Sequence, residues 1–282
     1  MNDDDGRRGP DGWRREIGAL TLTYLPDATI EIVPTAFIPG SDDDDWAARP
    51  DLRTDDGYLV AGAGSVVAEI GGRRLVVDAG FGPVSRGREE TPAHMGAARS
   101  GALPDSLAAA GIDPATVDRV ALTHLHSDHV GWATSTCVDD GNGLYPSATW
   151  IVGRGELDGP HRTPELVLAG EERRVRVVAH GEEVLPGMRA WSLPGHTTGH
   201  TAWVLDTGEG SVVLFGDAMH SPAQVEHPEW TVALDTDAAG AERSRRALIA
   251  ELARPGVLGL GVHFADRQLG RVVDGRWLPA TG

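Results

Sequence analysis

The segment from Thr123 to Trp132, THLHSDHVGW, places three histidines and an aspartate within six consecutive positions. Side chains alternate across an extended segment, so His124 and His126 point the same way and can share one ion. Asp128 and His129 follow at the turn and can reach a second ion beside it. Packing alone does not explain four ligand-type side chains so close together. The segment therefore predicts a metal site, and it requires a fold that brings further donors to the same place.

Further donors are needed because a zinc ion takes four or five ligands, one of them a water. Three candidates each stand at the end of a later apolar strand: His196 in LPGHTTGHTAW, Asp217 in SVVLFGDAMH and His263 in VLGLGVHF. Donors at strand ends converge on one edge of a sheet, where α/β enzymes place their chemistry. Together with the first segment, these residues predict two neighbouring metal sites.

The rest of the chain reads as strands that alternate with turns and helices. Residues 58–84 predict two antiparallel strands joined by a tight turn at Gly71-Gly72. Further strands are expected at 119–123, 149–152, 174–178, 188–193, 201–206, 211–216 and 256–262, and helices at 104–111 and 238–253. We expect a single α/β domain over residues 17–282, preceded by a disordered tail of residues 1–16, which mixes charges with Gly and Pro. Residues 40–57 are expected to form a surface loop.

The order of the motifs, HxHxDH, then PGHTxGH, then FGD, then a late histidine after a buried strand, resembles the metallo-β-lactamase superfamily. The match runs from about Tyr58 to His263, most of the chain. The resemblance implies an αββα four-layer sandwich with the metals in a groove at the sheet edges. It also implies three groups of ligands: His124, His126 and His196 on the first metal, Asp128, His129 and His263 on the second, and Asp217 bridging both.

The resemblance also suggests roles for residues around the ligands. Asp78, in LVVDAGF, matches an aspartate beneath the metal loop, and we expect it to orient the HxHxDH turn by hydrogen bonding without binding metal. His200 is not the family ligand; it either supports the ligands from behind or is paired within the core. His220 either walls the substrate pocket or has a structural role. The loops at 81–104 and 37–46 could cap the groove.

The metal sites predict hydrolysis. Two zinc ions would hold a shared hydroxide as the nucleophile, because metal binding lowers the pKa of water from about 15.7 to about 7. Asp128 is the candidate catalytic residue, since it can hold the nucleophile's proton or assist its transfer to the leaving group. Histidine and carboxylate donors suit Zn²⁺ but also accept Mn²⁺, Fe²⁺ or Co²⁺. We therefore expect a metal-dependent hydrolase with two ions per chain.

The substrate is narrowed by the residues after Asp217. AMHSPAQVEHPEW and the late HFADRQLGRVV look like the branch that contains methyl parathion hydrolase and, more distantly, N-acyl-homoserine lactonases. This similarity implies a small neutral substrate, and a lactone or carboxylic ester ranks first. Phosphotriester and thioester hydrolysis stay open as alternatives. So does a metal-stabilised binding protein without activity, although structural zinc sites favour closed cysteine-rich sets, whereas this set leaves positions for water.

Charge and hydropathy limit the partners. The 25 Lys and Arg against 42 Asp and Glu give a net charge of −17, which would repel a phosphate backbone, so no nucleic-acid partner is expected. No apolar run approaches the roughly 20 residues that span a bilayer, and the first residues lack the apolar stretch of a secretory signal. The single cysteine, Cys137, fits a reducing compartment. We expect a cytoplasmic protein, with the AMHSPAQVEHPEW region as a possible homodimer surface.

Overall fold

Two β-sheets form the centre of the structure, a computed structural model that describes residues 11–133, 143–158 and 174–280. Within these residues the first sheet has nine strands, of which eight follow the order β5 (Ser85–Arg86), β6 (Met95–Ser100), β2 (Leu20–Ile32), β3 (Leu59–Ile70), β4 (Arg73–Val77), β7 (Arg119–Ala121), β8 (Thr149–Gly153) and β9 (Arg174–Val178), while β1 (Trp13–Ile17) also pairs with β2. The second sheet has seven strands, in the order β10 (Glu183–Leu185), β11 (Met188–Ser192), β12 (Thr201–Asp206), β13 (Ser211–Leu214), β14 (Val257–Leu260), β15 (Leu269–Val273) and β16 (Arg276–Pro279).

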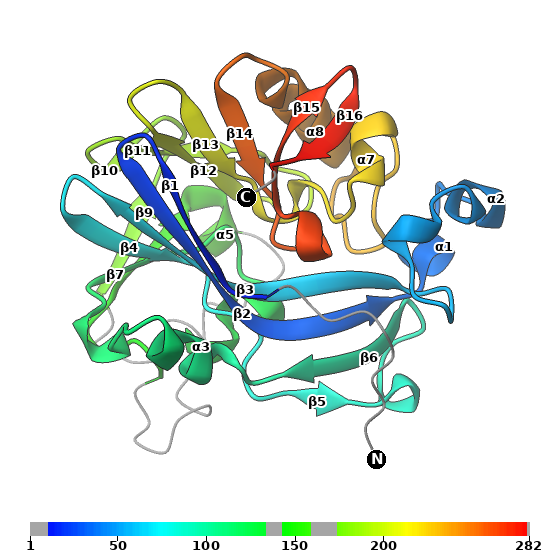
Figure 1. The fold of residues 1–282 in the computed structure, drawn as a ribbon, viewed down its shortest axis with the longest axis horizontal. Coiled ribbons are helices and arrows are strands. Elements are labelled where there is room, and N and C mark those ends of the chain that lie inside the picture. The colour runs from blue at the N-terminus through cyan, green and yellow to red at the C-terminus, as the bar shows by residue number, and fades with distance from the viewer. Residues whose placement is uncertain (1–10, 134–142, 159–173, 281–282) are drawn as a thin grey trace.

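The two sheets pack face to face, with a helix on the outer face of each (Figure 1). Between them lies an apolar layer that includes Leu22, Val66, Trp203 and Leu214. On the outside of the first sheet, α3 (Leu103–Ala109) lies against β2 and buries two leucines in one cluster with residues of β3 and β4. On the outside of the second, α8 (Ala238–Leu252) lies against β14 and β15 and buries Leu248 and Leu252. The predicted αββα four-layer sandwich is confirmed.

Local sequence explains several of these elements. The predicted hairpin at Gly71-Gly72 is confirmed: Ile70 pairs with Arg73, and both glycines have positive φ, as a two-residue hairpin turn of this kind requires. Helix α8 begins at the cap residue Asp237, whose side chain accepts a hydrogen bond from the Gly240 N–H. Short helices complete the described chain: α1 (Pro34–Phe37), α2 (Asp43–Ala47), α4 (Ser127–Val130), α5 (Arg154–Asp158) and α7 (Ala223–Glu226).

Two boundary predictions are wrong. The expected disordered tail of residues 1–16 overlaps β1, which pairs with the first half of β2 in an antiparallel register. Trp13 anchors this strand: its ring stacks on Tyr24, with centroids 6.1 Å apart, and its Nε1 donates to Gln268 Oε1 at 2.9 Å. The backbone pairing and this one partly buried aromatic outweigh the charged composition. Residues 1–10 of the predicted tail lie outside the described residues.

The expected surface loop at 40–57 contains α2, which was not predicted. Asp42 caps this helix by accepting from the Asp45 N–H, and the Asp45 side chain accepts from the Asp42 N–H in return. Trp46 is almost fully buried and packs against Trp230, with ring centroids 5.5 Å apart. The run of aspartates is therefore a helix start, because the reciprocal cap and the buried indole hold it in place.

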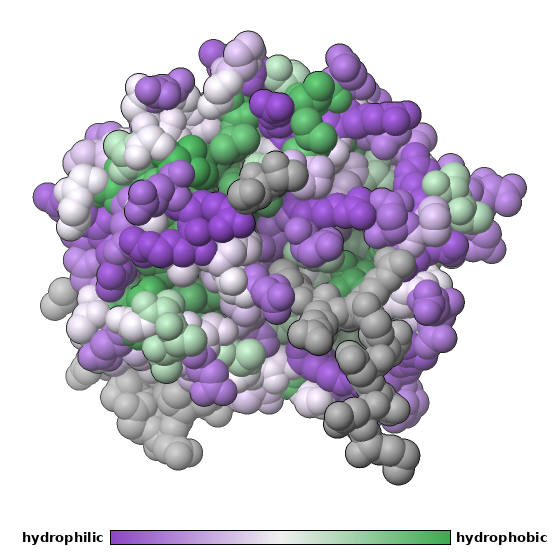
Figure 2. Space-filling model, viewed as in Figure 1, coloured by the Kyte–Doolittle hydropathy of each residue, from purple (hydrophilic) through white to green (hydrophobic). Residues whose placement is uncertain are grey.

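Figure 2 shows hydrophilic side chains over much of the face seen in Figure 1. Among the described helices, none has the length and apolar character needed to cross a membrane. Cys137 lies outside the described residues.

Candidate metal centre

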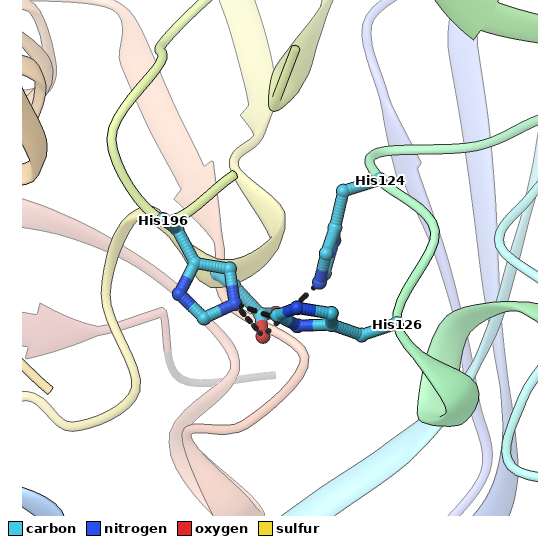
Figure 3. Close-up of side chains that lie close together, drawn as sticks. His124, His126 and His196 are labelled. Carbon is cyan, nitrogen blue, oxygen red and sulfur yellow. Dashed lines mark hydrogen bonds and ion pairs between the residues drawn. The ribbon is translucent and has the colours of Figure 1, made fainter. Parts of the chain in front are cut away.

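The seven predicted ligands lie in segments that follow strands of both sheets. His124 and His126 lie in the segment that follows β7, and α4 carries Asp128 and His129 directly after them. His196 lies in the loop between β11 and β12, while Asp217 and His263 follow β13 and β14. Figure 3 shows His124, His126 and His196 pointing toward one another from two separate segments. The sandwich thus brings donors from distant parts of the sequence to one edge.

The donor atoms fall into two sets, in each of which all atoms lie within 4.8 Å of one another. One set comprises His124, His126, His196 and Asp217, and the other comprises Asp128, His129, Asp217 and His263. Asp217 belongs to both. The structure therefore brings together all seven residues that the sequence singled out as ligands.

Asp217 presents one oxygen to each set. Its Oδ1 lies 3.0 Å from Nε2 of His129 and 3.0 Å from Nε2 of His263. Its Oδ2 lies 3.2 Å from Nε2 of His196 and 3.6 Å from Nε2 of His124. This is the arrangement of a carboxylate that can bridge two ions.

The chemistry of these atoms fits divalent cations. Among the described residues, Nε2 of His124, Nε2 of His129 and Oδ1 of Asp217 are buried without a well-formed hydrogen bond, although the last two atoms lie 3.0 Å apart. Buried polar atoms nearly always have a partner, and a metal ion between these atoms would supply one. Neutral imidazole nitrogens and carboxylate oxygens without thiolates suit Zn²⁺, Mn²⁺, Fe²⁺ or Co²⁺.

The charges around Asp217 keep its carboxylate ionised, which is the form that binds a cation. Burial acts to raise the pKa of Asp217, but the surrounding histidines, with His129 and His263 foremost, hold that pKa well below its usual value. Burial lowers the pKa of His124 well below the usual value of histidine, which keeps its ring neutral. Burial also acts to lower the pKa values of His129, His196 and His263, but nearby carboxylates, chiefly Asp217, raise them above the usual value of histidine. These three rings must therefore release a proton when they bind a metal ion.

Asp78 holds the first metal-binding segment from below. Its Oδ1 accepts a hydrogen bond from the Thr123 N–H at 2.7 Å, and its Oδ2 accepts from Nδ1 of His129 at 2.8 Å. This second bond fixes the His129 ring so that Nε2 faces Asp217. His263 is fixed in the same way, because its Nδ1 donates to the carbonyl oxygen of Gly62 at 2.7 Å. Asp78 belongs to neither donor set.

Two further carboxylates near the site were not predicted. Asp235 accepts from Nδ1 of His196 at 2.9 Å, and Glu156 binds backbone and side-chain groups next to the ligand histidines. In the sequence, Asp235 and Asp237 stand in one stretch, ALDTDAAG, with nothing to distinguish them. In the structure Asp237 caps α8, whereas Asp235 is buried against the metal centre.

His200 and His220 both contact Asp217. Nε2 of His200 accepts a hydrogen bond from the Asp217 N–H at 3.0 Å, so this histidine touches the backbone of the shared ligand and lies outside both donor sets. Nε2 of His220 lies 3.1 Å from Asp217 Oδ2, and its ring stacks on that of His263 with centroids 5.2 Å apart. His220 also borders the adjacent cavity.

A cavity of about 530 Å³ opens beside the donor atoms. One part of its wall is polar and is formed by His126, Asp128, Asp217, His220 and His263. The other part is mainly apolar, and Ile30, Ile32, Phe37, Ala61, Phe81, Met95, Ala233 and Leu234 contribute to it. The two segments proposed as caps, 37–46 and 81–104, thus each contribute side chains to the wall.

Comparisons with known proteins agree with this geometry. The family model described as "Metallo-beta-lactamase superfamily" matches residues 61–257. Human metallo-beta-lactamase domain-containing protein 1 is 30% identical over 219 residues, which cover 69% of this chain and 74% of that protein. The N-acyl homoserine lactonase AiiA of Bacillus thuringiensis subsp. kurstaki is 30% identical over 121 residues, which cover 41% of this chain and 44% of the lactonase. The chain therefore matches less than half of that lactonase's length.

Solved structures share the fold over nearly the whole chain. The dizinc quorum-quenching lactonase AidC, in complex with a product N-hexanoyl-L-homoserine, superposes with a TM-score of 0.78 at 20% identity, covering 96% of this chain and 98% of its own. The hydrolase AbOPH of the β-lactamase superfamily also has a TM-score of 0.78, at 22% identity, with 98% and 99% covered. At these identities the likeness concerns the fold.

Proposed function

The chain belongs to the metallo-β-lactamase superfamily of metal-dependent hydrolases, and we propose that it uses two zinc ions to open a small lactone or carboxylic ester. The observation that carries this proposal is the place of Asp217 in both donor sets, with one oxygen toward each. The first ion is assigned to His124, His126 and His196, and the second to Asp128, His129 and His263.

The chemistry needs a water nucleophile and a proton carrier. When bound, a pair of zinc ions would lower the pKa of water and polarise the substrate carbonyl. We assign the proton transfer to Asp128, because its side chain is 21% exposed and borders the cavity, whereas the side chain of Asp217 is buried. In the proposed reaction the Asp128 carboxylate accepts the proton of the attacking water and returns it to the leaving oxygen.

The cavity favours a substrate with an apolar acyl group. Some of the predicted metal ligands line one wall of the cavity, and the apolar residues Ile30, Phe37 and Met95 line another wall of the same cavity. Apolar side chains stabilise a bound acyl chain by roughly 25 cal/mol per Å² of apolar surface removed from water. The net charge of −17 favours a neutral substrate over an anionic one. The lactonases among the relatives and solved structures support a lactone as the first candidate.

The experiment is a substrate panel measured on the full chain with zinc. It includes N-acyl homoserine lactones and p-nitrophenyl esters with short and long acyl chains, a thioester and a phosphotriester. We expect a lactone or carboxylic ester to be the best substrate, with hydrolysis lost on chelation and restored by zinc. The matched control is Asp217→Asn, a variant of nearly the same shape. It should bind fewer ions and hydrolyse none of the substrates in the panel.

Other results would contradict the proposal in distinct ways. Phosphotriester or thioester hydrolysis more than about tenfold faster than that of any lactone or ester would favour the alternative hydrolases. A protein that binds two ions yet hydrolyses nothing in the panel would favour the metal-stabilised binding protein.

A further inference from the structure

Glu156 is a buried carboxylate that the proposed reaction does not use. It lies in α5, directly after β8, and is 4% exposed. Its Oε2 accepts from the Leu125 N–H at 3.1 Å. Its Oε1 accepts from the Gly199 N–H at 3.0 Å and from the hydroxyl of Thr197. Each carboxylate oxygen therefore binds a different segment of the chain.

Both segments carry ligands of the same ion. Leu125 lies between His124 and His126, and Thr197 directly follows His196. These are the three histidines of the donor set assigned to the first ion. Glu156 thus joins the backbone that carries two of the histidines to the backbone that carries the third.

The backbone of the PGHTTGH loop also packs closely against the backbone around Glu156. A Cβ atom added at Gly199 would lie 2.0 Å from the Glu156 backbone nitrogen, and one added at Gly155 would lie 2.7 Å from the Cα of Gly199. The start of α5 therefore lies directly against the PGHTTGH loop, without side chains between them. A shift of Glu156 would therefore displace the loop that carries His196.

We propose that Glu156 is the positioning residue of the first ion: it fixes the distance between the two segments so that His124, His126 and His196 converge. This inference rests on the two-metal site of the proposed function. Asp78 has the corresponding place beside the second ion, since it binds the Thr123 N–H and the ring of His129. Asp235 supports the first half in a different way, because it binds the ring of His196 and not the backbone of the two segments.

The test measures metal affinity separately at each ion, so it does not depend on finding the substrate. His263→Ala removes a ligand of the second ion and leaves the first set complete; His196→Ala does the reverse. Glu156→Gln is introduced into each background of the full chain. Glutamine keeps the shape of the side chain, but its terminal NH2 cannot accept a hydrogen bond, so it can accept from the Leu125 N–H or from the Gly199 N–H and not from both. Zinc dissociation constants are then measured by competition with a chromophoric chelator.

We expect Glu156→Gln to raise the zinc dissociation constant about tenfold or more in the His263→Ala background and less than about twofold in the His196→Ala background. Asp158→Asn, an exposed change on the same helix, is the matched control and should change neither. If Glu156→Gln does not fold, Thr197→Val removes one of its three hydrogen bonds at nearly constant shape and should weaken the first ion in the same direction.

Unchanged affinity at the first ion, or equal weakening of both ions, would overturn the inference. Failure of the proposed function gives a different result, because then the wild-type chain binds two ions, Glu156→Gln weakens the first, and no substrate is hydrolysed.

Discussion

Nδ1 of His196 lies 2.9 Å from Oδ1 of Asp235, while Nε2 of the same ring faces Asp217 Oδ2 at 3.2 Å. A histidine that donates one ring N–H to a carboxylate presents its other nitrogen as a fixed and more basic metal donor. Asp235 is itself held by hydrogen bonding, since its Oδ2 accepts from the Val232 N–H at 2.9 Å. The loop before α8 therefore sets the orientation of a metal ligand that lies in another loop.

Asp235→Asn should weaken zinc binding by about 10- to 100-fold, because the amide cannot act as the carboxylate partner of His196. The measurement is chelator competition on the full chain. Asp237→Asn is the matched control, because asparagine caps a helix about as well as aspartate and the exposed Asp237 side chain binds the Gly240 N–H. Equal zinc affinities in the two variants would contradict the role given to Asp235.

Arg245→Met should lower the free energy of unfolding of the metal-free chain by about 3–5 kcal/mol, because it removes the buried guanidinium beside the Asp235 carboxylate and leaves two buried carbonyl oxygens without their donor. The guanidinium of Arg245 is fully buried, lies 3.6 Å from Asp235 Oδ2 and donates to the carbonyl oxygens of Ala218 and Pro228. Urea denaturation measures the loss. Arg246→Met, on the exposed side of the same helix, should cost under about 1 kcal/mol; a similar loss in both variants would refute the prediction.

Leu234→Asn should raise KM for substrates with long acyl chains while leaving those with an acetyl group nearly unchanged. Leu234 borders the cavity and is 41% exposed, so its replacement removes apolar contact area without opening the core. Leu278→Asn is the control, since Leu278 is 45% exposed and does not border this cavity. The readout is kcat/KM across a series of acyl lengths. If both variants keep the wild-type dependence on chain length, the acyl group binds elsewhere.

Glu31→Gln should destabilise the chain at neutral pH and not in acid. Paired hydrogen bonds from Arg88, at 2.7 and 2.9 Å, lower the pKa of Glu31 below 4.5 in the folded state. Stability from a carboxylate with a lowered folded pKa is fully present above its unfolded pKa and is lost as pH falls through the folded value. The difference in unfolding free energy between wild type and variant should therefore be constant from pH 7 to about 5 and shrink below pH 4.5.

The control for this prediction is Glu89→Gln, which changes an exposed carboxylate directly after Arg88 in the chain. A difference for Glu31→Gln that persists unchanged into acid would show that the carboxylate charge is not what stabilises the pairing.

The strands and the donor residues were predicted from local signals in the sequence, whereas the four-layer sandwich was implied by the resemblance of the motif order to a known family. Apolar strands that end in His or Asp mark the sheet edge, and the Gly71-Gly72 turn marks a hairpin. The residues that support the donors carry no such signal. Glu156 and Asp235 lie far along the chain from the groups they bind, and only the folded backbone brings them together. Strand β1 was also missed, because its charged composition suggested disorder. Its pairing with β2 forms only in the folded chain.

The most direct test of the two-metal hydrolase is a zinc titration of the metal-free chain, with bound zinc and lactone or ester hydrolysis followed together. We predict that two equivalents bind per chain, that hydrolysis rises to its full rate only with the second, and that Asp217→Asn binds about one equivalent without activity. Full hydrolysis at one equivalent, or an Asp217→Asn variant with two bound ions and wild-type turnover, would contradict the bridging role of Asp217 and the two-metal mechanism with it.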